Sequence, residues 1–290
     1  MISDAPRLPN FLVIGAMKAG TTSLYHYLRS HPQVFMPETK EVNFFNPMRN
    51  WRRGVEWYEA QFAGVGDDVT AVGEASTSYT KFPWVQGVPQ RIVSTLGANV
   101  RLIYVVRDPI ERMRSQYLHN LTTGQETRSI EDAFSSEPMY LNISRYAMQL
   151  EQYDPCFGRD RLMIVDSREL RNDRAKTVQR IFDFIGVDSG WVPPAIDQEF
   201  LRSEGRRLKS PVLRAVRRIP RVRTMAVYVP DSIKRSKRQL TGRLGSGEEV
   251  QTGRAGISDE LRARLVEILT EDVGRFRGYV GAGFDGWGIG

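Results

Sequence analysis

The sequence has few of the residues that crosslink a chain or hold a metal. Its 290 residues include one cysteine, Cys156, and three histidines. A lone cysteine cannot close an internal disulfide, and no Cys or His stands beside it at metal-ligand spacing, so we expect neither a disulfide scaffold nor a zinc site. We interpret Cys156 as a small packed side chain.

Long apolar runs are also missing. No stretch of about 18 uninterrupted apolar residues occurs, which excludes an ordinary membrane-spanning helix. Residues 1–10 have neither the basic nor the apolar region of a signal peptide. With 41% hydrophobic residues, the chain can still bury a substantial core. We therefore expect a globular protein that stays in the cytoplasm.

Positive charge is unevenly distributed along the chain. The formal net charge is +7, and residues 206–238 alone hold 12 lysines and arginines against one acid, Asp231. This segment lacks zinc-finger, RRM-like and helix-turn-helix patterns, so we expect no nucleic-acid partner. Two interpretations stay open: a solvated helical face, or a surface for anionic lipid or an acidic acceptor, which would give peripheral membrane contact.

Apolar runs and helical patterns alternate along the chain. The predicted strands cover residues 11–15, 69–73, 100–106 and 162–165. The predicted helices cover residues 21–30, 55–62, 90–96, 109–121, 130–134, 146–153, 173–185 and 258–276. This alternation is typical of an α/β fold, with a mostly parallel central sheet flanked by helices and a ligand site at the carboxyl ends of the strands. We predict a single domain over residues 1–290, in which residues 205–250 form a basic insertion or flexible flap.

A glycine-containing loop lies between the first predicted strand and the first predicted helix. Successive backbone N–H groups and the helix dipole at such a turn form a site for a phosphate. The predicted ligands are Lys18, Ala19, Gly20, Thr21, Thr22 and Ser23. A tight turn that merely uses glycine is the alternative, but the added lysine and hydroxyls favour phosphate binding.

The position of the lysine separates this loop from that of nucleoside triphosphatases. Their Gly-x-x-x-x-Gly-Lys-Ser/Thr loop places the lysine directly after the second glycine. Here Lys18 comes before Gly20. The hydroxyl that would hold Mg²⁺ therefore loses its usual lysine neighbour, and we expect a P-loop-like site that works without a metal.

A second phosphate motif follows the predicted strand at residues 100–106. Arg107 leaves the end of this strand, and Ser115 follows on the next predicted helix. An arginine fork and a serine hydroxyl can both bind one phosphate. Asp108 could pass for a metal-binding acid, but Pro109 and the cationic neighbours make it a helix cap.

These two motifs resemble those of sulfotransferases that use 3′-phosphoadenosine 5′-phosphosulfate (PAPS). Residues 15–23 resemble the 5′-phosphosulfate loop of this family, and residues 102–117 resemble its 3′-phosphate motif. The resemblance covers the chain except residues 205–250. It implies PAPS as the donor, adenosine 3′,5′-bisphosphate (PAP) as the product and no metal. It assigns Arg107 and Ser115 to the 3′-phosphate, and more weakly Arg254 to a loop over the same group.

A third motif supplies the candidate base. The segment Glu-Thr-Lys-Glu-Val-Asn-Phe-Phe-Asn at residues 38–46 resembles the Glu-Val-His-Phe-Phe segment of the heparan sulfate-type and bacterial branch, whose glutamate is the general base. The match falls on Glu41, which Phe44 and its neighbour could keep partly desolvated. A surface glutamate paired with Lys40 is the alternative. Asn43 stands where this branch often has histidine.

The segment after the second predicted strand departs from the family pattern. Relatives write Glu-Lys-Ser/Thr-Pro where this chain has Glu74 and Ala75, so a lysine is missing. Either Lys40 supplies the second cation or Lys18 acts alone. The predicted acceptor contacts are Glu74, Phe44 and Tyr146. A buried structural carboxylate is the alternative role for Glu74.

Together the motifs predict in-line sulfuryl transfer from PAPS. Glu41 would take a proton from an acceptor hydroxyl, or less readily an amine, while Lys18 and the loop amides stabilise the departing 5′-phosphate. The acceptor is predicted only as a small molecule, a carbohydrate or a glycolipid, and a homodimer is left open. A P-loop kinase or nucleotidase is the competing enzyme class, and a non-catalytic protein that binds a phosphorylated ligand is the non-enzymatic alternative.

Overall fold

The fold is built on one parallel sheet. The computed structural model describes residues 7–198, 256–281 and 283–290. In these residues five strands pair in the order β2-β3-β1-β4-β5, and each neighbouring pair is parallel. The strands are β1 (Phe11–Gly15), β2 (Val34–Phe35), β3 (Ala71–Ala75), β4 (Arg101–Val106) and β5 (Leu162–Asp166). The predicted α/β fold is confirmed.

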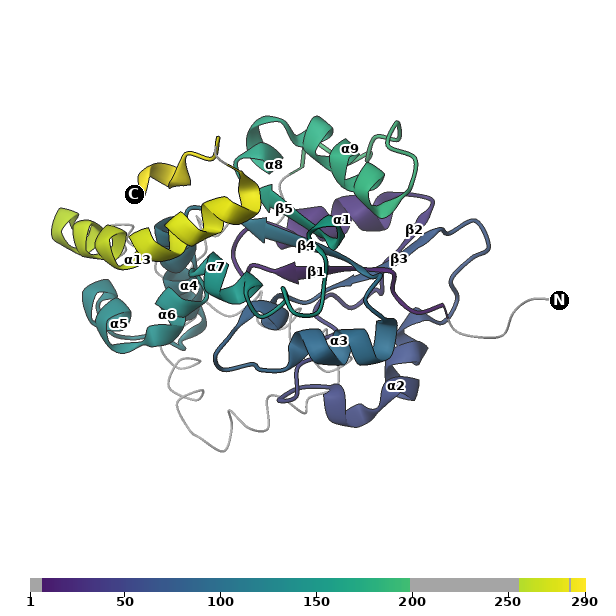
Figure 1. The fold of residues 1–290 in the computed structure, drawn as a ribbon, viewed down its shortest axis with the longest axis horizontal. Helices are drawn as coiled ribbons and strands as arrows, with labels where there is room; N and C mark the ends of the chain where they lie inside the picture. Colours follow the sequence, from purple (N-terminus) through teal and green to yellow (C-terminus); the bar gives the residue numbers. More distant parts are fainter. Residues whose placement is uncertain (1–6, 199–255, 282) are drawn as a thin grey trace, which may run out of the picture.

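Helices cover both faces of this sheet (Figure 1). Helices α1, α8 and α9 lie on one face and α2 and α3 on the other, while α4 to α7 and α13 gather beyond the carboxyl ends of the strands. Their bounds are α1 (Thr21–Ser30), α2 (Val55–Glu59), α3 (Val88–Leu96), α4 (Pro109–Thr123), α5 (Ile130–Ser136), α6 (Pro138–Asn142), α7 (Tyr146–Leu150), α8 (Glu169–Asn172), α9 (Arg174–Ile185) and α13 (Asp259–Val280). A short 3-10 helix, η3 (Thr77–Thr80), follows β3 closely.

Strong apolar patterns predicted the element bounds most accurately. α1 has the predicted bounds, and β1 is buried throughout, as a strand covered on both faces requires. β3 begins at Ala71 rather than at residue 69, and the helix predicted over residues 146–153 ends at Leu150. β2 was missed because its two residues are too few to form a periodic pattern.

A second apolar cluster lies beyond the end of the sheet. Ile110 and Met113 of α4 share it with Leu261, Leu265 and Leu269 of α13, and all five are buried. The C-terminal helix therefore packs on the helix that follows β4.

Asp272 adds a polar link between α13 and α7. Its side chain is buried, and its carboxylate accepts hydrogen bonds from the N–H groups of Ala147 (3.1 Å) and Met148 (3.0 Å). These N–H groups start α7 and have no partner within that helix. Asp272 thus fixes α7 against the C-terminal helix.

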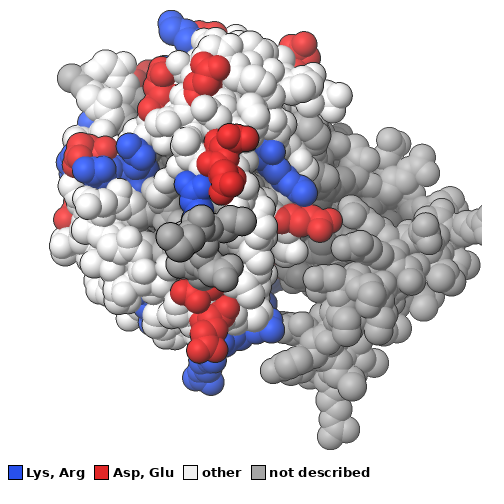
Figure 2. All heavy atoms as spheres, turned by 90° about the vertical axis from the view of Figure 1, so that its right-hand side faces the viewer, with Lys and Arg blue, Asp and Glu red and all other residues white. Residues whose placement is uncertain are grey.

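Figure 2 shows the face where the strands begin, which is the right-hand side of Figure 1. Acidic and basic side chains of the described residues are interspersed over this face, without a large patch of one sign. Within the described residues, lysine and arginine side chains cluster instead at the opposite end of the sheet, beyond the carboxyl ends of the strands.

Candidate functional site

The loop between β1 and α1 has the geometry of an anion site. β1 ends at Gly15, where a Cβ would lie 2.1 Å from Oγ1 of Thr80, so only glycine fits. Lys18 (φ 72°) and Gly20 (φ 107°) both adopt left-handed backbone angles, which turn the chain into the helix. In the described structure no side chain caps the start of α1. The positive end of the helix dipole is therefore not neutralised by a capping side chain.

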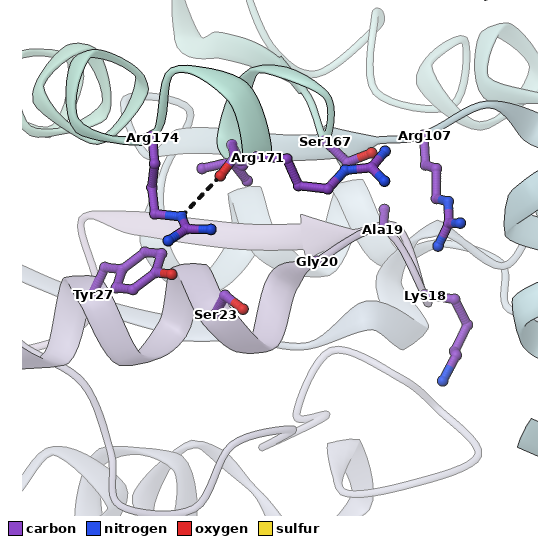
Figure 3. Close-up of a pocket in the computed structure, with 10 residues that line it drawn as sticks. Lys18, Ala19, Gly20, Ser23, Tyr27, Arg107, Ser167, Arg171 and Arg174 are labelled. Atoms are coloured by element: carbon purple, nitrogen blue, oxygen red, sulfur yellow. Dashed lines mark hydrogen bonds between the residues drawn. The ribbon is translucent and has the colours of Figure 1, made fainter. Parts of the chain in front are cut away.

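A pocket opens at this loop, at the carboxyl ends of β1, β4 and β5 (Figure 3). It is lined by Lys18, Ala19, Gly20, Ser23, Tyr27, Arg107, Ser167, Leu170, Arg171 and Arg174. Figure 3 shows Arg107 extending toward Lys18, whereas Arg174 points toward Tyr27 of α1. Four of the ten lining residues are cations and none is an acid. Charge of one sign in a concave site attracts a multiply charged anion.

Arg107 enters this pocket from the end of β4. Its backbone carbonyl accepts a hydrogen bond from the hydroxyl of Tyr146 at 2.7 Å, which fixes the end of the strand. Its guanidinium Nη2 lies 3.6 Å from Oε2 of Glu111. Its buried Nε has no hydrogen-bond partner among the described residues, so the side chain keeps donor capacity for an anion. The next residue, Asp108, caps α4 by accepting from the N–H of Ile110 at 2.8 Å, which confirms the predicted cap.

The predicted phosphate ligands divide into two groups. Those that line the pocket are Lys18, Ala19, Gly20, Ser23 and Arg107. Thr21 and Ser115 are buried and, like Thr22, do not line it. Arg254 lies outside the described residues, as does the basic segment 206–238. The structure thus brings the core of both predicted phosphate motifs to one cavity.

Sequence reasoning missed the third wall of the pocket. Ser167, Leu170 and Arg171 follow β5, and Arg174 begins α9. Ser167 is 7% exposed, and its Oγ has no hydrogen-bond partner within the described chain. A signal existed, because residues after parallel strands share the edge at which ligands bind. The missing knowledge was the strand order, which places β5 beside β4.

A buried arginine, also missed, connects the two phosphate motifs. The guanidinium of Arg112 donates to the carbonyl of Met17 in the loop (3.4 Å), to Oε1 of Gln116 (2.8 Å), to Oγ of Ser144 (2.6 Å) and to the carbonyl of Tyr140 (2.7 Å). Complete burial lowers the pKa of Arg112 to about 10, so it stays charged at neutral pH. All four acceptors are neutral, so none of them cancels the positive charge of Arg112, which lies behind the anion pocket.

Glu41 lies on a loop at the same edge of the sheet. Its N–H donates to the carbonyl of Ala75 at 3.0 Å, at the end of β3, and β3 is the neighbour of β1. Its carboxylate accepts from Nζ of Lys40 at 2.8 Å and from the N–H of Thr77 at 2.9 Å. The side chain remains 34% exposed, so it can still meet an acceptor from solvent. The pair with Lys40, left open by the sequence, is present and orients the carboxylate.

The three predicted acceptor contacts lie in the core. Glu74 and Phe44 are 0% exposed and Tyr146 is 1% exposed. Phe44 stacks on Tyr58 with ring centroids 4.2 Å apart. Burial raises the pKa of Glu74 to about 7, against the opposing effect of three hydroxyl donors. Side chains without exposed surface offer an acceptor nothing to touch, so the structure places these three behind the site, not in its wall.

Three further features concern cofactors and membranes. Within the described residues, no group of three His, Cys, Asp or Glu side chains is placed to hold a metal ion. No helix in this same part of the chain is long and apolar enough to cross a membrane. Cys156 carries a free thiol and is partly buried.

Comparison with known proteins decides the family. The sulfotransferase domain family matches residues 8–203. The chain belongs to the sulfotransferase family. The matched region contains Lys18, Glu41 and Arg107, whereas α13 of this sulfotransferase lies outside it. A solved sulfotransferase structure from Alicyclobacillus acidocaldarius shares the fold, with a TM-score of 0.68 over 97% of this chain and 99% of that one, at 24% identity.

Curated sulfotransferases are similar over shorter spans. The membrane-associated sulfotransferase kil1 of Dictyostelium discoideum is 41% identical over 112 residues, 38% of this chain and 22% of that protein. The bifunctional heparan sulfate N-deacetylase/N-sulfotransferase 4 of Mus musculus is 31% identical over 203 residues, 62% and 22% of the two chains. The heparan sulfate glucosamine 3-O-sulfotransferase 3B1 of Mus musculus is 27% identical over 194 residues, 64% and 48%. This sulfotransferase therefore spans less than half the length of each of these relatives.

Proposed function

We propose that this sulfotransferase moves a sulfuryl group from PAPS to a carbohydrate acceptor. The observation that carries the proposal is the shared pocket of Lys18 and Arg107, which come from the ends of adjacent strands β1 and β4. PAPS has one phosphate on the 3′ side of its ribose and a phosphosulfate on the 5′ side. A cavity with cations at separate positions and no acid in its lining suits such a ligand.

Each end of the donor has its own set of proposed ligands. Lys18 and the backbone N–H groups of residues 18–23 would hold the 5′-phosphosulfate at the start of α1. Arg107 would hold the 3′-phosphate, and Ser115 and Arg254 stay proposals for that same group. Arg171 and Arg174 add positive charge to the opposite wall, so the product PAP, with its two negatively charged phosphates, would also be bound well.

The proposed reaction is one in-line displacement at sulfur. Glu41 takes the proton of an acceptor hydroxyl, the acceptor oxygen attacks sulfur, and the bond between sulfur and the 5′-phosphate oxygen breaks. The leaving electron pair stays on that phosphate, where Lys18 and the loop amides stabilise the charge. Lys40 holds the Glu41 carboxylate in place before the transfer. This proposal needs no metal.

The acceptor class follows from the named relatives. Two of them are heparan sulfate enzymes by name, one an N-sulfotransferase and one a 3-O-sulfotransferase, which supports a carbohydrate hydroxyl or amine as the acceptor. A glycolipid or another small molecule would offer the same hydroxyl chemistry. A cytoplasmic location and a homodimer remain predictions. Membrane contact through residues 206–238 is a prediction as well, and that segment lies outside the described residues.

The donor is tested by calorimetry. We expect PAP to bind at micromolar concentration without metal and ATP to bind far more weakly, because ATP lacks the 3′-phosphate that Arg107 would hold. Lys18→Met should weaken PAP binding by about 10-fold, the loss of one charge-assisted contact. Preference for ATP with Mg²⁺ would overturn the proposal in favour of a kinase.

The base is tested by the substitution Glu41→Gln. With PAPS and heparosan oligosaccharides, both N-acetylated and de-N-acetylated, we expect kcat to fall by about 10²- to 10³-fold while the Kd of PAP stays unchanged. Glu38→Gln, on the same loop and exposed, is the matched control. Wild-type turnover in Glu41→Gln would reject Glu41 as the base. Tight PAP binding with no transfer to any acceptor would instead favour a non-catalytic binding protein.

A further inference from the structure

A fully buried carboxylate lies directly behind the loop that carries Glu41. Oε1 of Glu74, in β3, accepts hydrogen bonds from the hydroxyls of Tyr58 (3.0 Å) and Tyr79 (2.7 Å), and Oε2 accepts from Oγ of Ser76 (2.7 Å). No basic side chain of the described residues forms an ion pair with it. An ionised carboxylate only accepts hydrogen bonds, so it fixes the direction of all three hydroxyl protons.

Two of these hydroxyls pass the interaction on to the loop. Oγ of Ser76 accepts from the N–H of Asn43 at 2.8 Å, and the hydroxyl of Tyr79 accepts from the N–H of Phe45 at 3.3 Å. Each hydroxyl can accept from the loop because its own proton is directed at the carboxylate. The hydroxyl of Tyr58 makes no second hydrogen bond within the described chain, which makes it a natural control.

The loop needs such support. Glu41 (φ 66°) and Asn43 (φ 53°) both adopt left-handed backbone angles, which residues with a side chain rarely do. These conformations persist only where the surroundings hold them. Further contacts come from the same segment, since the N–H of Thr77 donates to the Glu41 carboxylate and Oγ of Ser78 donates to Oδ1 of Asn43 at 2.5 Å. The segment from β3 to η3 therefore acts as a clamp on the loop, with Glu74 at its buried centre.

We propose that Glu74 is a positioning residue for Glu41. It orients the hydroxyls of Ser76 and Tyr79 so that both accept loop N–H groups, and it thereby holds the Glu41 carboxylate where an acceptor can reach it. The inference rests on the proposed role of Glu41 as the base. Glu74 itself is fully buried, so it touches neither PAPS nor the sulfuryl acceptor.

Charge, and not shape alone, is what the position requires. In Glu74→Gln the amide NH₂ donates to one of the two hydroxyls, which therefore loses the carboxylate oxygen that fixed the direction of its proton. That proton can then turn toward the loop N–H, where two donors oppose each other. One arm of the clamp is lost although the side chain keeps its size.

The first test measures amide hydrogen exchange and needs no sulfuryl acceptor. Hydrogen exchange at the amides of Asn43 and Phe45 should speed up in Glu74→Gln. Tyr79→Phe should speed up exchange mainly at Phe45, and Ser76→Ala mainly at Asn43. Tyr58→Phe removes a phenol hydroxyl from the same carboxylate oxygen as Tyr79→Phe but touches no loop amide, so exchange should match the wild type.

The second test is kinetic, at about pH 8, above the raised pKa of Glu74, where the carboxylate is ionised. Misplacing a reacting group by about 1 Å can cost about 10²-fold in rate. We therefore expect kcat to fall about 10- to 100-fold in Glu74→Gln, and about 10-fold when one arm is removed by Ser76→Ala or Tyr79→Phe. The Kd of PAP should stay unchanged, and Tyr58→Phe should turn over like the wild type.

The outcomes separate this inference from the proposed function. Wild-type turnover in Glu41→Gln would show that Glu41 is not the base, and the inference about Glu74 would fall with it. Loss of turnover in Glu41→Gln, with full turnover and slow exchange in both Ser76→Ala and Tyr79→Phe, rejects the clamp and leaves the proposed function standing. Equal losses in Tyr58→Phe and Tyr79→Phe would mean that the hydroxyls act only through packing, which also rejects it. If Glu74→Gln fails to fold, the two single-arm variants still decide.

Discussion

Three buried side-chain atoms of the described residues have no hydrogen-bond partner: the hydroxyl of Tyr104, Nε of Arg107 and Oγ of Ser167. Arg107 and Ser167 both line the anion pocket. Leaving a buried polar atom unpaired costs about 1–3 kcal/mol in folding free energy, so proteins keep such atoms mainly where a ligand or water completes the bond. Under the proposed function, these two pocket atoms would donate to the bound anion.

Ser167→Ala should have opposite effects on stability and binding. Removal of an unpaired buried hydroxyl should leave the melting temperature unchanged or slightly higher. The Kd of PAP should rise by about 3- to 10-fold, the value of one hydrogen bond. Calorimetry and thermal unfolding measure the two effects on the same sample.

Ser94→Ala is the control for that variant, because Ser94 is exposed on α3 and its hydroxyl bonds only a backbone carbonyl, that of Arg91. It should change neither quantity. An unchanged Kd in Ser167→Ala would show that the ligand does not use this hydroxyl.

At the scale of elements, Arg112 joins the helix after β4 to the loop after β1. Its four hydrogen bonds reach Met17 and three groups on α4, α6 and the α6–α7 turn. Arg112→Lys keeps the charge but cannot reproduce the planar fork of donors, so several buried acceptors lose a partner. We expect the free energy of unfolding in urea to fall by about 2–3 kcal/mol and PAP binding to weaken.

Arg114→Lys provides the comparison on the same helix. The Arg114 side chain is partly exposed, and its guanidinium lies 3.4 Å from Glu111. Exposed ion pairs contribute about 0–1 kcal/mol, so this variant should be close to the wild type. Equal free energies of unfolding in the two variants would contradict a stabilising role for the buried guanidinium of Arg112.

The sequence predicted the elements with clear patterns and the motifs that are continuous along the chain. Lys18 and Arg107 were found because each follows an apolar strand, and Asp108 because a proline follows it. Ser167 and Arg112 were missed for different reasons. Ser167 becomes part of the site only through the strand order, and a buried arginine on α4 looks like a surface residue until Met17 is known to lie against it.

The sequence offered a buried structural carboxylate as one role for Glu74, and its burial confirms that alternative, but the groups that surround it could not be predicted. Its role depends on Tyr58, Ser76 and Tyr79 meeting around one carboxylate, and Tyr58 comes from α2, a different part of the chain. Local patterns predict which residues follow a strand. They do not predict which hydroxyls from other elements will surround a side chain in the core.

At the scale of the whole molecule, the rigid parts and the reacting parts are separated. The sheet is covered by helices on both faces (Figure 1), and Lys18, Glu41 and Arg107 lie on loops beyond the carboxyl ends of its strands. Those loops are tied to buried polar groups, Arg112 for the phosphate loop and Glu74 for the loop of Glu41. The core therefore supports the site through a small number of buried hydrogen bonds. One of the groups that form them, the carboxyl of Glu74, can ionise, so the stability of the fold should depend on its protonation.

The stability of the entire fold should depend on pH through Glu74. Burial raises its pKa from the usual 4.5 to about 7, so the folded protein holds this proton more tightly than the unfolded chain. The stabilising contribution is then complete below about pH 4.5 and is lost as the pH rises through about 7, with an upper limit of about 3 kcal/mol. Urea unfolding of the wild type and Glu74→Gln between about pH 5 and pH 8 measures it, since glutamine has no proton to lose. We expect the wild type to lose stability relative to the variant over this interval, whereas a difference that does not change with pH would mean that Glu74 is ionised throughout, and that its three hydroxyl donors outweigh the cost of burying the charge.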